Sequence, residues 1–284
     1  MSFGHWQIEP TELAPVIVLV IAYWRRARVL AAKRRPVARR RQAAFAAGIA
    51  VLVLALISPL DWYGENRLLW VHMIQHLAIG DIAAPLIVLG LTGALLGPLL
   101  RVRLMRRLRV LAHPLVALPL WIVDLYVWHL PVLYQAALNN DQTIHPLEHI
   151  CFFVCGALMW AAVIEPLPGP RWFTTGWKFA YTFVVRVAET ILANVFIWGQ
   201  HPYYAYYLVR EHSASGAVGD QRIAGLIMFV EGSFVTLGAL VWLFLRFMRE
   251  AEIRQRLIDR GVDVAVATRA ARSSNSARVR EVSR

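Results

Sequence analysis

Seven apolar segments, most of them near the length that crosses a bilayer, constrain the fold of this chain more than any other feature. A helix of about 20 apolar residues spans the hydrocarbon core of a membrane. Hydrophobic residues make up 58% of the chain, against about 45–50% in soluble domains. We therefore predict an all-α, polytopic membrane protein with about seven transmembrane helices, over residues 11–27, 43–61, 67–91, 113–130, 146–165, 178–199 and 222–247.

The basic residues lie mostly in alternate connections between these segments. Nine Lys and Arg fall within residues 25–41, five Arg within 101–109, and ten Arg after residue 245. Together with the two in 165–178, these are 26 of the 30 Lys and Arg. Because basic connections stay in the cytoplasm, the N-terminus is predicted to lie outside and the C-terminus in the cytoplasm of a bacterial plasma membrane. The net charge of +12 is then a topology signal and indicates no nucleic-acid partner.

The chain divides into two predicted regions. Residues 1–247 form the seven-helix transmembrane domain, and residues 248–284 form a basic cytoplasmic tail whose polar end is predicted to be partly disordered. The first residues lack the basic start of a signal peptide, so the first apolar segment is predicted to be a retained helix. Cys151 and Cys155 lie four apart on one predicted helix, a spacing that does not suit a disulfide.

Six histidines fall at a similar depth, near the outer ends of four predicted helices. Because residues four apart share a helix face, His72 and His76 can point at one atom, and His145 and His149 have the same spacing. Imidazole is a common ligand of copper, zinc and iron, and ionisable groups within a membrane usually serve a site. A single interfacial histidine also suits a polar anchor, and the first pair also suits a helix–helix hydrogen bond. Taken together, the six predict a metal site that faces the extracytoplasmic water: His72, His76, His129, His145, His149 and His201.

Charged residues also occur deep within the predicted helices. Asp81, Arg186 and Glu189 are expected to form a charge network, in preference to a proton path. Asp81 lies about 180° around its helix from His72, so it is not expected to bind the same metal. Glu231 has no partner that the sequence identifies. The remaining soft ligands are expected to pack in the apolar interior: Met73, Met228, Cys151 and Cys155.

Several ordered motifs carry a family resemblance. HMIQHL followed by AAPLIVLG, then WHLPVLYQAAL, HPLEHICFFVCGALMW and DQRIAGLIMFV, resemble the CtaG family of membrane proteins that assist cytochrome c oxidase assembly in bacteria. The likeness covers about residues 67–232, and Glu231-Gly232 stands where the family has a Pro-Gly pair. It implies a seven-helix protein that supplies or guards copper for the oxidase. The matching positions are His72, His76, His129, His145, His149, Asp220, Gln221, Gly225 and Met228.

The leading hypothesis is an accessory protein that binds copper transiently and helps to metallate or stabilise an oxidase subunit. An open histidine cluster can hold copper and also release it. The lipid bilayer and an oxidase subunit are the expected partners. No nucleophile–base pair, phosphate loop or dinucleotide motif is present, so no enzymatic activity is expected. The alternatives are a membrane haem protein that carries electrons and a copper or proton transporter that uses the buried charges.

Overall fold

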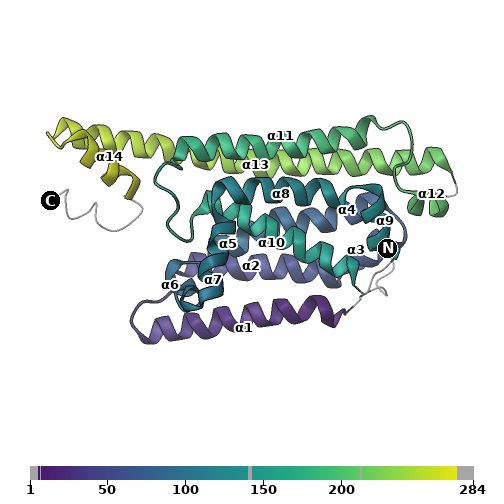
Figure 1. The fold of residues 1–284 in the computed structure, drawn as a ribbon, viewed down its shortest axis with the longest axis horizontal. Helices are drawn as coiled ribbons and strands as arrows, with labels where there is room; N and C mark the ends of the chain where they lie inside the picture. The colour runs from purple at the N-terminus through teal and green to yellow at the C-terminus, as the bar shows by residue number, and fades with distance from the viewer. Residues whose placement is uncertain (1–5, 7, 140–142, 212, 274–284) are drawn as a thin grey trace.

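Long helices lying side by side form an elongated bundle, with short helices at both ends (Figure 1). The computed structural model describes residues 6, 8–139, 143–211 and 213–273, and these contain helices and no β-strand. The long elements are α1 (Pro10–Ala32), α2 (Arg39–Ile57), α8 (Pro114–Trp128), α10 (Ile144–Ile164), α11 (Thr175–Trp198) and α13 (Ala214–Asp259). One more consists of α4 (Leu69–Leu77), the π-helical turn η1 (Ala78–Ala83) and α5 (Ala84–Gly90).

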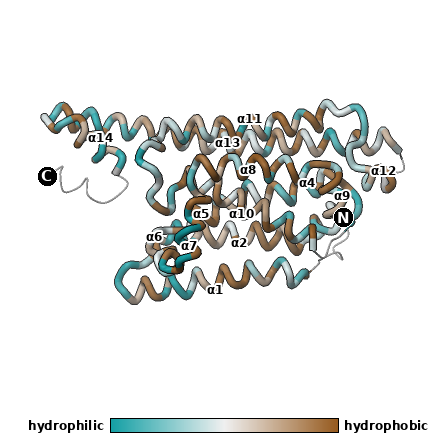
Figure 2. Tube along the Cα trace, in the orientation of Figure 1, coloured by the Kyte–Doolittle hydropathy of each residue, from teal (hydrophilic) through white to brown (hydrophobic). Residues whose placement is uncertain are grey.

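The two ends of the bundle differ in character. The end near the N-terminus carries the short helices α3 (Pro59–Asn66), α9 (Pro131–Asn139) and α12 (Ala205–Glu211). The opposite end carries α6 (Gly93–Leu96), η2 (Leu99–Arg101), α7 (Arg103–Leu108), η3 (Arg109–Ala112) and α14 (Val264–Ser273). Figure 2 shows apolar residues along the long helices and strongly polar stretches at this second end, where the predicted basic connections lie.

The all-helical, multi-pass prediction is confirmed for the described residues. Five elements are long and apolar enough to cross a membrane: α2, α4–α5, α10, α11 and α13. The segment α7–η3 and helix α8 are bent by 76° relative to each other and add a sixth span if they are counted together. Helix α1 has 23 residues but is not among these spans, because Glu12 on one side and Arg25 and Arg26 on the other limit its uncharged stretch to residues 13–24.

Helix boundaries depart from the apolar segments where capping or ion pairs decide them. Ser58 ends α2 and its hydroxyl accepts a hydrogen bond from Leu60 N at 3.4 Å, which starts α3 within the predicted segment 43–61. By contrast, α13 continues to Asp259, beyond the end of the predicted segment 222–247. An i,i+4 ion pair between Arg246 and Glu250, 2.8 Å apart, supports this extension. The end of the predicted disordered tail, residues 274–284, lies outside the described residues.

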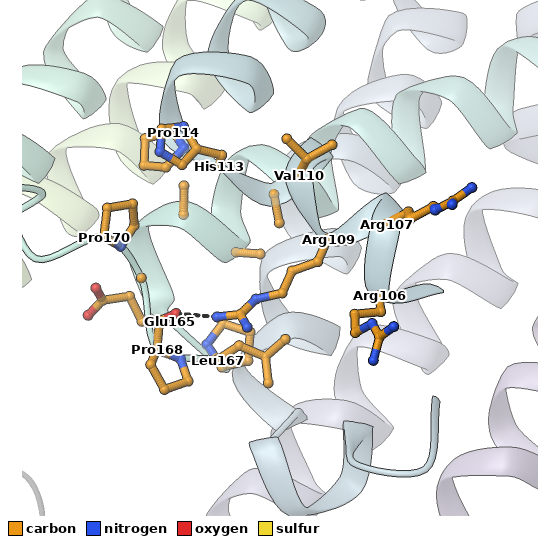
Figure 3. A pocket seen from close by; sticks show the side chains of 15 residues that line it. Arg106, Arg107, Arg109, Val110, His113, Pro114, Glu165, Leu167, Pro168 and Pro170 are labelled. Atoms are coloured by element: carbon orange, nitrogen blue, oxygen red, sulfur yellow. Dashed lines mark hydrogen bonds between the residues drawn. The ribbon is translucent and has the colours of Figure 1, made fainter. Parts of the chain in front are cut away.

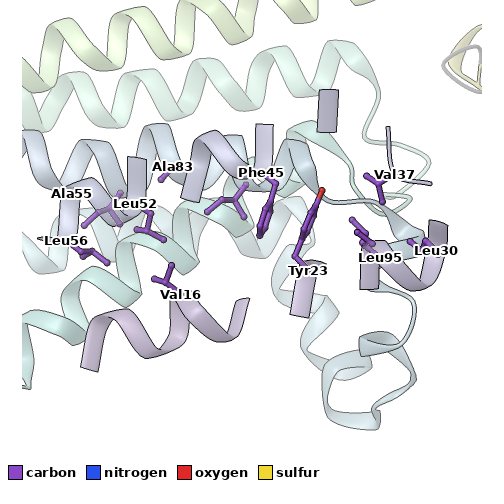
Figure 4. Packing of buried hydrophobic residues seen from close by; sticks show 13 residues of the cluster. Val16, Tyr23, Leu30, Val37, Phe45, Leu52, Ala55, Leu56, Ala83 and Leu95 are labelled. Atoms are coloured by element: carbon purple, nitrogen blue, oxygen red, sulfur yellow. The ribbon is translucent and has the colours of Figure 1, made fainter. Parts of the chain in front are cut away.

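Aromatic packing joins α1 to α2 and α5 in one apolar cluster (Figure 4). The ring of Tyr23 stacks on Phe45 with centroids 3.6 Å apart, and its hydroxyl donates to Gly90 O at 3.4 Å. Phe45 is fully buried, and Leu52 of α2 and Val16 of α1 continue the same cluster toward the start of α1. This packing holds α1 along the length of α2, so that the N-terminal end of α1 reaches the end of the bundle that carries α3, α9 and α12.

Candidate metal centre

Four of the six predicted histidines meet inside the bundle. His72 and His76 come from α4, and His145 and His149 come from α10. Ring centroids lie 4.2 Å apart within each pair and 5.3–5.4 Å apart between His72 and His145 and between His76 and His149. None of the four exceeds 6% exposure. The i,i+4 spacing thus presents two imidazoles from each helix to a common interior space.

A buried carboxylate, Glu148, completes this group. Candidate ligand atoms of His72, His76, His145 and Glu148 all lie within 4.8 Å of one another. Both ring nitrogens of His72 and His76, Nε2 of His145 and His149, and both carboxylate oxygens of Glu148 have no hydrogen-bond partner among the described residues. Leaving buried polar atoms unpaired costs roughly 1–3 kcal/mol each. Coordination of a cation satisfies them, so this donor set fits a metal ion.

Two carboxylates from other helices orient the α10 histidines. Glu65 of α3 lies 2.7 Å from Nδ1 of His145, and Glu12 of α1 lies 2.7 Å from Nδ1 of His149. An Nδ1–H that donates to a carboxylate leaves the Nε2 lone pair free for a metal. The contacts therefore favour the tautomer in which both Nε2 atoms keep a free lone pair.

Asp61 adds a further carboxyl group beside the centre. Its Oδ1 accepts a hydrogen bond from Gln75 Nε2 at 2.5 Å, and Gln75 also donates to Ala55 O at 3.2 Å. Asp61, Glu65 and His145 form another group whose candidate ligand atoms lie within 4.8 Å of one another. Burial, with the nearby Glu65 carboxylate, raises the pKa of Asp61 to about 7. The Asp61 carboxyl therefore keeps its proton in mildly acidic solution.

Replacing this carboxyl group by an amide tests the pKa of Asp61. The ordinary value is 3.8 and the folded value is about 7, so the stability that the retained proton provides is fully present below 3.8 and is lost as pH rises through 7. Asp61→Asn removes this pH dependence and keeps an acceptor for Gln75. We expect the variant to gain stability over the wild type between pH 5 and pH 8, by at most about 3 kcal/mol. Thermal unfolding of the metal-free proteins at pH 5 and pH 8 measures this gain. If the stability difference between Asp61→Asn and the wild type is the same at the two pH values, the pKa of Asp61 is not raised.

Contacts from the last long helix hold α4 and its neighbours in place. The carboxylate of Asp220 accepts hydrogen bonds from Leu69 N at 2.7 Å and Trp70 N at 3.2 Å, which caps the N-terminus of α4. Gln221 accepts a hydrogen bond from Tyr203 N at 2.9 Å. These two motif residues therefore act on the framework around the centre, and Asp220 is in none of the candidate ligand groups found among the described residues.

The other two predicted histidines differ from the four in their contacts, although His129 borders the same small cavity as His76 and its buried Nε2 has no hydrogen-bond partner among the described residues. His129 Nδ1 is 2.7 Å from Leu125 O, and its ring packs beside Phe152 with centroids 6.0 Å apart. His201 is exposed, and its main-chain oxygen accepts a hydrogen bond from Gln221 Nε2 at 3.3 Å. Neither is among the candidate ligand groups of the described residues. A metal-binding role for these two stays a prediction.

The sequence reasoning missed the carboxylates. Glu148 follows His145 by three residues in HPLEH and therefore shares its helix face, which is a usable signal. The others are acidic residues near the outer ends of the first two apolar segments, and they reach the site only through helix packing: Glu12, Asp61 and Glu65.

Of the charged residues deeper in the bundle, Arg186 and Glu189 form an ion pair, and no ion pair of Arg186 with Asp81 or Glu231 is present among the described residues. The Arg186 guanidinium lies 3.6 Å from Glu189 and donates to Ser233 Oγ at 2.6 Å. Asp81, Glu189 and Glu231 line a cavity of about 40 Å³ that His76 also borders. The soft ligands pack in apolar clusters or beside them: Met73 and Met228 with α11 residues, and Cys155 with Trp121 and Met159.

The comparison with known families agrees with the resemblance carried by the motifs. No curated protein and no solved structure matches the chain. Residues 21–250 match the family model described as cytochrome c oxidase caa3 assembly factor. This match covers most of the chain, including α2 to α12 and the histidine pairs of α4 and α10. The chain therefore belongs to the cytochrome c oxidase caa3 assembly factor family.

Proposed function

We propose that the protein assists cytochrome c oxidase assembly by binding copper transiently at the histidine cluster and passing it to an oxidase subunit. Family membership supports the assembly role. The observation that carries the copper role is the set of buried, unpartnered imidazole nitrogens and Glu148 oxygens gathered from two helices. Such a set is costly to maintain in a membrane protein unless a cation occupies it.

The donor set favours copper as a releasable cargo. Imidazoles bind copper well, and copper stands at the top of the divalent affinity order. Cys151 and Cys155 are absent from the candidate ligand groups, so no thiolate closes a tight cage around the ion. Rings packed 4.2 Å apart in each pair also favour a single ion over a haem, because haem iron takes axial ligands from opposite faces of a wide macrocycle.

We place the cluster at the extracytoplasmic side of a bacterial plasma membrane, with seven crossings. Helix α1, which lies along α2, and helix α8, which follows the bend after α7–η3, bring the five spans to seven. The arginine-rich connections gather at the end opposite the cluster, and basic connections stay in the cytoplasm. A copper ion at the cluster then lies on the side from which an oxidase subunit can receive it outside the cytoplasm.

Complementation of a strain that lacks the gene tests this function. The wild-type protein restores oxidase activity and oxidase copper content, whereas His72→Ala/His145→Ala is expected to lower both several-fold at equal protein level. His113→Ala is the matched control, because His113 lies at the opposite end of the bundle as the N-cap of α8. Full restoration by the double variant overturns the copper role.

The carboxylates that contact the α10 histidines, Glu65 and Glu12, are expected to affect copper affinity less than the histidines themselves. Glu65→Gln/Glu12→Gln keeps the shape of both side chains but removes the charges that orient His145 and His149. Changes of this kind typically cost 10–100-fold in metal affinity. We expect a weakening of copper binding within that range in a competition titration with a chelator. Glu252→Gln is the control, since its ion pair with Arg256 lies far along α13, and an unchanged affinity in the Glu65/Glu12 variant contradicts the orienting role.

The small cavity supports a second candidate function, movement of protons or copper through the bundle. It joins His76 of the cluster to Asp81, Glu189 and Glu231, and about 40 Å³ is enough for one or two waters. Proteoliposomes test this route. A copper or proton flux that Glu231→Gln abolishes establishes transport, and the absence of flux in the wild type leaves the assembly role alone.

A further inference from the structure

A separate cavity of about 460 Å³ lies at the end of the bundle opposite the histidines. It is formed between α7–η3 and the connection that follows α10 (Figure 3). Arg106, Arg107 and Arg109 line one side, and Leu167 and Pro168 line the other. Arg109 reaches across and donates to Pro168 O at 2.7 Å, which ties the two walls together.

The cavity carries an excess of positive charge. The acidic residue in its lining, Glu165, is already paired: its carboxylate forms an ion pair with Lys178 and lies 3.7 Å from Arg246. The two cations neutralise Glu165, so it does not offset the arginines. The guanidinium groups of Arg106 and Arg109 therefore present an anion-binding surface beside walls of proline and leucine, and Arg107 adds positive charge at the outer edge of the cavity (Figure 3).

Neighbouring side chains place the cavity at the level of the membrane surface. Leu104, Leu108 and Val110 are 58%, 42% and 59% exposed on the same short helices that carry the arginines. Helices that expose apolar and basic residues side by side lie in the interface between lipid and water. Trp172 and Trp177 are also exposed, with ring centroids 6.2 Å apart, and tryptophan is enriched at that depth. Lipid phosphates occupy the same level.

We propose that this cavity binds the phosphate of an anionic phospholipid from the surrounding bilayer. Arginine is well suited to phosphate because its planar guanidinium donates two parallel hydrogen bonds, and basic pockets at the cytoplasmic side of membrane helices are known headgroup sites. The apolar wall of Leu167 and Pro168 accommodates the glycerol and the start of the acyl chains. Free phosphate shares the anionic chemistry but has no part that would contact this wall. The site is independent of the copper role.

Native mass spectrometry of the purified full-length protein tests the site. Titrations use phosphatidylglycerol, phosphatidylcholine and inorganic phosphate as separate probes. We expect retention of phosphatidylglycerol over phosphatidylcholine and a loss of about tenfold in its affinity, about 1.4 kcal/mol, in Arg106→Gln/Arg107→Gln/Arg109→Gln, because these side chains supply the charged hydrogen-bond donors to the phosphate. The control, Arg35→Gln/Arg39→Gln/Arg40→Gln, removes the same charge from the α1–α2 connection and the first turn of α2 and is expected to keep the wild-type affinity.

Each other outcome overturns the proposal. Equal lipid affinity in the triple variant and the wild type shows that the arginines are not part of the site. If the control variant loses as much lipid affinity as the triple variant, the effect comes from net charge and not from this cavity. Displacement of phosphatidylglycerol by millimolar inorganic phosphate reassigns the site to a free anion. Circular dichroism and thermal unfolding show whether the triple variant is folded. If it is not, Arg106→Gln alone is expected to lower the affinity, and an unchanged value for this variant rejects the site.

Discussion

Purified protein that carries His72→Ala and His145→Ala is expected to lose stable copper binding. The two substitutions remove one imidazole from each helix and leave His76 and His149, whose rings are 5.4 Å apart, without their partners. Outer contacts alone change metal affinity by 10–100-fold, so the loss of two direct ligands is expected to lower affinity by roughly a hundredfold or more. Metal analysis after dialysis and a chelator competition titration measure the effect.

Two single variants define the boundary of the centre in the same assay. His113→Ala removes an imidazole at the far end of the bundle, and His201→Ala removes an exposed one in the connection between α11 and α12. From the geometry, both are expected to bind copper as the wild type does. A loss of copper in His201→Ala extends the site to that residue, as the sequence pattern predicts, and equal copper content in the double variant and the wild type removes His72 and His145 from it.

Gly64→Ala is expected to weaken copper binding without touching a ligand. A Cβ at position 64 would lie 2.8 Å from His72 Cα and 3.0 Å from His72 N. Because these are backbone atoms, α3 and α4 must separate to admit the methyl group. The separation moves Glu65 away from His145 and breaks the 2.7 Å contact that orients its ring. We expect the affinity to fall by about 10–100-fold, together with a loss of stability of about 1–3 kcal/mol from the forced shift.

The matched control for Gly64→Ala is Gly238→Ala. A Cβ at position 238 meets no atom within 4 Å, and alanine replaces glycine within α13, where it is expected to raise helix stability by up to about 1 kcal/mol. Chelator competition and thermal unfolding of both variants separate the steric effect from the general effect of adding a methyl group. Wild-type copper affinity in Gly64→Ala would show that the spacing of α3 and α4 does not matter to the site.

Local spacing explains the part of the centre that the sequence predicted. His72 and His76, and likewise His145 and His149, are one helical turn apart, so each pair points in one direction whatever the rest of the chain does. Asp61, Glu12 and Glu65 carry no such signal, because their distances to the histidines depend on how α1 and α3 pack against α10. For the same reason, the depth of His129 and His201 did not reveal that they lie outside the candidate ligand groups.

The sequence by itself determined the helical, multi-pass architecture, the family and the two imidazole pairs, because apolar length and i,i+4 spacing are properties of the local chain. Only the tertiary structure decided which pairs face each other, which carboxylates orient them and that Gly64 must lie against His72. These relations join residues up to 137 positions apart, as in the contact between Glu12 and His149. They arise from helix packing, which is set by the whole set of interhelical contacts and not by any single segment.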